Sequence, residues 1–226
     1  MIKSILSIDL DSIWEGEETA YVNPDKLVNT KMLDLVKSLS QKSRSNIELG
    51  IDHHELCSII DECDYSFEID NIDAHHDLYA EDYDSWLNPL FIRSSKITVG
   101  NFLFQLLREN RLSRVNWLTP SYYNKQLSQK KILENIGKFY FKKVSLINAC
   151  EYSYKQHYDL IFISISPEWI PSKNRTVIKE ILTDFGFSKN MILSYLDKVD
   201  LRWSFQDNEE LILADRFYFK EMYCRR

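Results

Sequence analysis

Aspartate and histidine residues gather in one short stretch of this 226-residue chain, Asn71-Ile72-Asp73-Ala74-His75-His76-Asp77. If residues 65–72 form a strand and the chain stays extended beyond it, Asp73, His75 and Asp77 point to one side. Carboxylate oxygens and imidazole nitrogens are ligands for hard or borderline divalent cations. Such polar positions are also costly to bury unless they are paired or bound to a metal. The stretch therefore predicts a metal site.

Two further segments carry the same chemistry, each after a strand-like run. They are Gly50-Ile51-Asp52-His53-His54-Glu55, which ends the run 46–51, and Ser7-Ile8-Asp9-Leu10-Asp11, which follows the run 2–6. Taken alone, each has a structural interpretation, since Asp9 and Asp11 could cap a helix and His53 and His54 could be solvated loop residues.

The apolar periodicity predicts strands that alternate with helices. This alternation implies a largely parallel sheet covered on both faces, and we expect a single three-layer α/β/α domain over residues 1–226. Ligands of such sheets bind beyond the carboxyl ends of the strands. The expected strands are 2–10, 47–51, 65–72, 114–118, 143–147 and 159–165, and the expected helices are 23–39, 54–61, 99–106, 128–136, 177–185 and 189–197.

Composition narrows the classes of function. A net charge of −6 argues against binding nucleic acid through its backbone. No apolar run approaches the roughly 20 residues that cross a bilayer, and the N-terminus lacks a signal-peptide pattern, so we expect a cytoplasmic protein without a membrane partner. The four cysteines have no metal-binding or redox spacing and are expected to be reduced.

Together, the three polar segments resemble motifs of the arginase/deacetylase superfamily. Residues 73–77 look like its D-A-H-x-D motif, residues 50–54 like G-G-D-H-S, and residues 7–11 like S-x-D-x-D. With the late Ser-Pro-Glu-Trp at 166–169, the combination is similar to the peptide arginases. These enzymes convert arginine side chains of ribosomally made precursor peptides to ornithine and release urea. In ordinary arginases the S-x-D-x-D strand follows D-A-H-x-D, whereas here it begins the chain.

The resemblance implies a site with two manganese ions and an arginine-containing precursor peptide as the partner. Asp73 and Asp9 would bridge the two ions. The implied ligands are His53, Asp73, Asp77 and Asp9 for one ion, and His75, Asp73, Asp9 and Asp11 for the other.

Other residues receive roles in this hypothesis. Glu168, just beyond the strand 159–165, is the nearest candidate to bind the substrate guanidinium, although it could be a surface carboxylate in a proline-bracketed turn. His54 or His76 would protonate the departing amine or orient the ligands. The long loop 78–92 offers Asp82 and Asp84 to a cationic peptide, or packs on the sheet as a structural excursion.

Three alternatives stay open. A deacetylase-like amidohydrolase of the same superfamily usually uses one zinc ion. A phosphoesterase of the D-H-H type resembles the chain at Asp52-His53-His54, but leaves residues 73–77 poorly explained. A non-enzymatic binding module stabilised by metal is the third.

Overall fold

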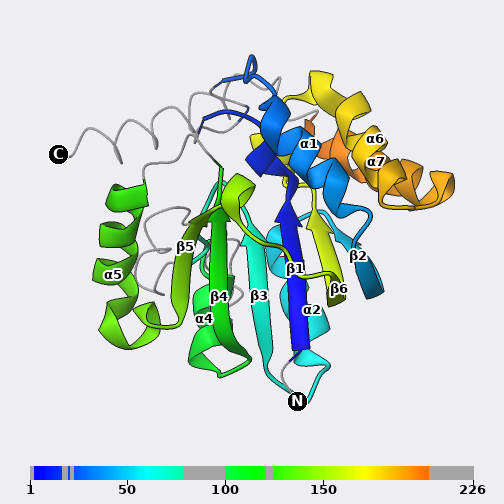
Figure 1. The fold of residues 1–226 in the computed structure, drawn as a ribbon. Coiled ribbons are helices and arrows are strands. Elements are labelled where there is room, and N and C mark those ends of the chain that lie inside the picture. Colours follow the sequence, from blue (N-terminus) through cyan, green and yellow to red (C-terminus); the bar gives the residue numbers. More distant parts are fainter. Residues whose placement is uncertain (1–2, 17–19, 21–22, 79–99, 121–124, 204–226) are drawn as a thin grey trace.

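The computed structural model describes residues 3–16, 20, 23–78, 100–120 and 125–203. Its centre is a six-stranded sheet in which every pairing is parallel, with the strand order β2-β6-β1-β3-β4-β5 (Figure 1). The strands are β1 (Lys3–Asp9), β2 (Ser43–Gly50), β3 (Phe67–Ile72), β4 (Leu112–Thr119), β5 (Val144–Asn148) and β6 (His157–Ser164). The α-helices described are α1 (Thr30–Leu39), α2 (Leu56–Asp61), α4 (Phe102–Arg108), α5 (Lys125–Phe141), α6 (Arg175–Asp184) and α7 (Lys189–Trp203).

Alternating side chains bury both faces of the sheet. In β1, Leu6 and Ile8 pack in the cluster formed with α1, α6 and α7, whereas Ile5 packs in the cluster formed with α2, α4 and α5. In β6, Ile161 joins the first cluster and Phe162 the second. The predicted three-layer α/β/α arrangement is therefore confirmed for the described residues.

The sheet has a switch point between β1 and β3. These strands are neighbours, but the chain leaves β1 toward β2 through α1 on one face and leaves β3 toward β4 through α4 on the other. Crevices at such points, beyond the carboxyl ends of the strands, are where ligands bind in open α/β sheets.

Several helix boundaries differ from the sequence prediction, and the helix expected at 128–136, for example, spans Lys125–Phe141. The helix expected from residue 23 begins at Thr30, because the Asn29 side chain accepts a hydrogen bond from the Met32 amide and a bridge between Trp14 and Val28 keeps the preceding residues extended. The last helix continues past residue 197, since Val199 and Trp203 extend its buried side. No helix in the described ranges is long and apolar enough to cross a bilayer.

Candidate metal centre

The end of β1 turns sharply at its two aspartates. Asp9 is the last residue of the strand, and a 3₁₀ turn, η1 (Leu10–Ile13), follows at once. The Asp11 amide donates to Asp9 Oδ1 at 3.2 Å and the Ser12 hydroxyl donates to the Asp9 carbonyl at 2.7 Å. Both carboxylates are buried, so this turn brings two acidic side chains to the carboxyl edge of the sheet.

The histidine-rich segment after β3 is a loop. The strand ends at Ile72, and Asp77 adopts a left-handed conformation with φ of 48°. The expectation that alternation sends Asp73, His75 and Asp77 to one side is therefore wrong, because the chain is no longer extended there. Instead, Asp73 and Asp77 approach His53, whereas His75 approaches Asp11. The convergence predicted from the sequence arises from the loop.

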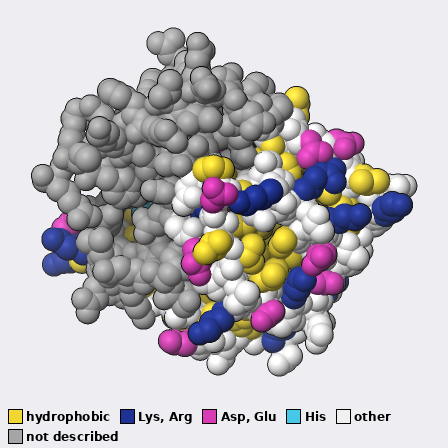
Figure 2. Space-filling model, turned by 90° about the horizontal axis from the view of Figure 1, so that it is seen from above, with side chains coloured by type: hydrophobic (Ala, Val, Ile, Leu, Met, Phe, Trp, Pro, Cys, Tyr) yellow, Lys and Arg dark blue, Asp and Glu magenta, His cyan; other side chains and the backbone are white. Residues whose placement is uncertain are grey.

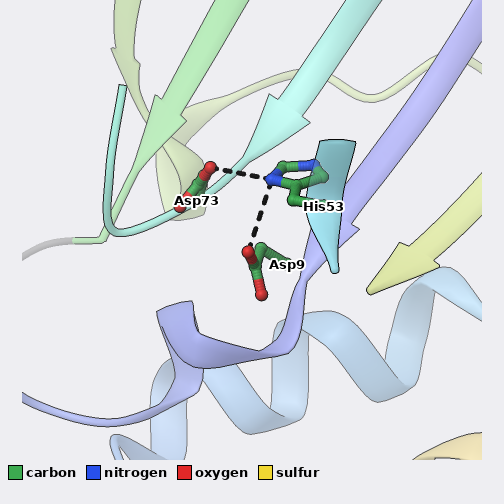
Figure 3. Close-up of side chains that lie close together, drawn as sticks. All are labelled: Asp9, His53 and Asp73. Atoms are coloured by element: carbon green, nitrogen blue, oxygen red, sulfur yellow. Dashed lines mark ion pairs between the residues drawn. The ribbon is translucent and has the colours of Figure 1, made fainter. Parts of the chain in front are cut away.

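His53 lies at the centre of the first ligand group. Its Nδ1 atom is 3.0 Å from Asp73 Oδ2, 3.1 Å from Asp77 Oδ2 and 3.3 Å from Asp9 Oδ2. Figure 3 shows this nitrogen directed between Asp9 and Asp73. None of the three contacts has the alignment of a hydrogen bond. The Nδ1 atom can donate only one hydrogen bond, so it cannot pair with all three carboxylates. A cation bound among the nitrogen and the carboxylate oxygens could balance their charge.

The other ring nitrogen of His53 fixes the orientation of the imidazole. Nε2 lies 2.7 Å from the Ser7 hydroxyl, and the ring is parallel to Phe162, with centroids 6.3 Å apart. Metal-bound histidines commonly hold their second nitrogen in this way.

A second ligand group shares Asp73 with the first. His75 Nδ1 lies 2.9 Å from Asp11 Oδ2 and 3.8 Å from Asp73 Oδ1. The ligand atoms of Asp11, Asp73 and His75 lie within 4.8 Å of one another, as do those of Asp9, His53 and Asp73. The two groups share Asp73, whereas Asp9, the other predicted bridging ligand, is in the first group and not in the second, and Asp77 lies beside the first group through its contact with His53.

Burial and the closeness of other carboxylates shift the pKa values of the aspartates in this cluster. Burial and the neighbouring Asp11 raise the pKa of Asp9 to about 7. Burial and Asp77 hold the pKa of Asp73 well above its usual range. Burial alone would raise the pKa of Asp11 too, but the charge of His75 brings it below its ordinary value. Two of the buried acids therefore disfavour ionisation without a cation to balance them.

The donor set suits a hard or borderline divalent cation. It consists of carboxylate oxygens and imidazole nitrogens, as Mn²⁺ binds them, and contains no thiolate. The buried carboxylates and the unsatisfied position at His53 Nδ1 fit a bound ion, so these groups could hold a metal.

Three neighbours of the ligands received no role from the sequence, although two of them belong to the Ser-Pro-Glu-Trp segment at 166–169. Ser166 donates to Asp9 Oδ2 at 2.7 Å, Trp169 packs on His75 with ring centroids 4.1 Å apart, and the buried Lys26 donates to the Trp169 carbonyl at 3.3 Å. Ser7 was recognisable, since a polar residue inside an apolar buried strand is unusual. Lys26 gives no such local signal.

Glu168 lies in a short turn, η4 (Pro167–Trp169), and its carboxylate already contacts a guanidinium. Arg202 Nη1 donates to Glu168 Oε1 at 2.5 Å, while both terminal nitrogens donate to Asp52 at 3.0 and 2.7 Å. Figure 2 shows the molecule from above, where basic and acidic side chains lie next to one another on the described part of the surface.

The remaining predicted residues take different positions. His76 is buried, accepts a hydrogen bond from the Leu78 amide and packs edge-on against Trp117, so it supports the loop 73–78. His54 has a buried Nδ1 that makes no hydrogen bond to any described residue. Asp82 and Asp84 lie outside the described residues, as does the loop 79–92.

No family model, curated protein or solved structure matches this chain. The resemblance to peptide arginases therefore stays a prediction drawn from the motifs.

Proposed function

We propose that this protein is a manganese-dependent hydrolase of the peptide arginase type, which converts arginine side chains of a precursor peptide to ornithine and urea. The observation that carries the proposal is the pair of ligand groups that share Asp73. Two adjoining groups favour two ions over the single zinc of a deacetylase-like enzyme. The oxygen-rich donor set favours manganese over softer metals.

The expected chemistry divides between the metal centre and its rim. When bound, two manganese ions would supply an activated water at neutral pH. Trp169, packed on His75, offers an aromatic face on which a planar guanidinium would stack. Glu168 would accept the guanidinium through Oε2, because its Oε1 atom contacts Arg202. His54, with its buried and unbonded Nδ1, is the better candidate to protonate the departing amine.

A peptide assay tests this function. The manganese-loaded protein should convert arginine-containing peptides to products lighter by the mass of the lost cyanamide unit, about 42 Da, with one urea per turnover. Glu168→Gln should reduce the rate by a few orders of magnitude, on the scale of about 3–5 kcal/mol for a broken charge pair, and should still bind manganese at saturating concentration, because Arg202 keeps its two-pronged pair with Asp52. Unchanged activity in this variant would remove Glu168 from the mechanism. No urea from any basic peptide would reject the proposal.

A phosphoesterase is the second candidate, and Lys26 is the observation that favours it. This buried cation acts with His75 to lower the pKa of Asp11, so positive charge lies near the ligands, as an anionic substrate would require. Release of phosphate from model diesters, in place of urea from peptides, would select this alternative.

A further inference from the structure

The C-terminal end of α7 contacts two turns at the carboxyl edge of the sheet. Arg202 forms a two-pronged ion pair with Asp52, which follows β2, and a single contact with Glu168, which follows β6. The adjacent Trp203 donates its indole N–H to the carbonyls of Pro167 and Ile170 at 3.1 and 3.0 Å, on either side of Glu168. One helix end therefore holds both turns.

Each of these turns supports a metal ligand. Asp52 directly precedes His53, and the Asp52 amide is held by Glu55 Oε1 at 3.0 Å, so the start of this turn is constrained on both sides. The second turn begins at Ser166, which donates to Asp9, and contains Trp169, which packs on His75. A shift of either turn would move His53 relative to Asp9, or release contacts that orient Asp9 and His75.

We propose that Arg202 is a positioning residue for the metal centre, which joins the His53 turn to the Ser166–Trp169 turn and thereby sets metal affinity. The inference rests on the metal centre of the proposed function. Without the guanidinium, Asp52 and Glu168 would be two like charges close together and would tend to separate. The planar fork of arginine suits this task because it can bind one carboxylate with two nitrogens while contacting the second.

The chain provides a matched control in Arg175. It forms an ion pair from α6 to Asp200 of α7, with Nε 3.0 and 3.1 Å from the two carboxylate oxygens. Its side chain is 37% exposed and that of Arg202 is 39% exposed. The two arginines thus have similar exposure and each forms a pair that involves α7, but Asp200 is 44% exposed where Asp52 is 17% exposed, and the Arg175 pair joins α6 to α7 and not the two turns.

The test is calorimetric titration of the metal-free full chain with Mn²⁺, together with its melting temperature. Arg202→Gln should weaken manganese binding by about tenfold or more, as loss of an outer contact to metal ligands does, while Arg175→Gln should bind as the wild type. Arg202→Lys should recover only part of the affinity, because an ammonium cannot form the fork. Asp52→Asn, which removes one acceptor charge and keeps its shape, should weaken binding in the same direction.

Three results would overturn the inference. Equal manganese affinity in the wild type and in Arg202→Gln, whatever the melting temperatures, would leave Arg202 with a stabilising role only. Equal losses in the Arg202→Gln and Arg175→Gln variants would trace the effect to general loosening of α7. A wild type that binds no manganese would reject the proposed metal centre and this inference together, whereas binding without urea release would reject only the arginase activity.

Discussion

Asp70 and Asp73 are buried acids three residues apart whose surroundings differ. Asp70 accepts hydrogen bonds from Asn116, Tyr152 and Tyr158 at 2.7, 2.9 and 2.7 Å, so its charge is satisfied within the fold. Asp73 instead lies among other carboxylates, which together with burial raise its pKa. Asp70 is therefore paired within the fold, whereas Asp73 lies where a cation could balance the neighbouring carboxylates.

Substitution by asparagine should separate these roles. Asp73→Asn should lose manganese by elemental analysis, yet melt at or above the wild-type temperature when metal-free, because one buried like charge is removed. Asp70→Asn should lose about 1–3 kcal/mol of unfolding free energy and keep its manganese, since it leaves buried donors poorly paired. Full manganese content in Asp73→Asn would contradict the shared-ligand role.

The pH dependence of the metal-free protein follows from His75. Burial alone would lower its pKa, but the Asp11 carboxylate raises it from 6.5 to about 9. A base with a raised pKa stabilises the fold while protonated, so this contribution is complete below pH 6.5 and lost as the pH rises through about 9. Asp9 makes a second contribution of this kind. Its raised pKa favours the protonated acid in the folded state, so stability is lost as the pH rises from 3.8 to about 7.

The melting temperature of the metal-free protein, measured by differential scanning fluorimetry, should therefore fall by several degrees between pH 6.5 and 9. With saturating manganese the fall should disappear, since a ligating imidazole is neutral. His75→Gln provides the control and should reduce the slope of this part of the metal-free profile, while His53, whose pKa is also raised, against the effect of burial, by its neighbouring carboxylates, accounts for the slope that remains. A flat profile in the metal-free wild type would contradict the ion pair with Asp11.

At the scale of elements, the end of β2 meets β6 with little space. A Cβ added to Gly50 would lie 2.7 Å from Phe162 Cζ, and the Phe162 ring is parallel to that of His53. Gly50→Ala should thus cost about 1–3 kcal/mol of unfolding free energy and weaken manganese binding, since Phe162 must move.

Phe162→Leu provides the matched test, because it removes the atoms that the new methyl group would meet. The double variant should be more stable than the sum of the single effects indicates, by about 1 kcal/mol in a chemical denaturation cycle. If the changes in unfolding free energy of the two single variants add up to that of the double variant, the two positions do not interact.

At the scale of the whole molecule, a metal ion at the candidate site would link segments that are distant in the chain. Asp9, His53 and Asp73 come from three different strand ends. An ion that binds only the folded chain stabilises it by about 2.7 kcal/mol at a free concentration of one hundred times its Kd. For a chain of this length, that corresponds to a melting temperature higher by roughly 5–10 °C.

Addition of manganese to chelator-treated protein should produce this shift in a thermal melt. The Asp73→Asn variant should show little or none of it, because both ligand groups contain Asp73. An equal shift in both proteins would mean that manganese acts elsewhere on the molecule.

The sequence by itself determined the class of the fold and the main residues of the candidate site. Alternating apolar patterns identified the strands and helices, and parallel strands necessarily bring their carboxyl ends to one edge. Polar segments after three strands therefore had to lie at one edge of the sheet. Asp9, Asp11, His53, Asp73, His75 and Asp77 could be selected without knowing which strands were neighbours.

Only the tertiary structure decided how these residues are held. The loop after Ile72 depends on packing against Trp117, whose indole donates to the Asp73 carbonyl, and not on strand alternation. Ser166 reaches Asp9 across 157 positions, and Arg202 reaches Asp52 across 150. These contacts exist because β6 lies between β1 and β2 in the sheet and α7 packs against the turn that follows it. Strand order arises from long-range packing, which no local pattern in the chain encodes.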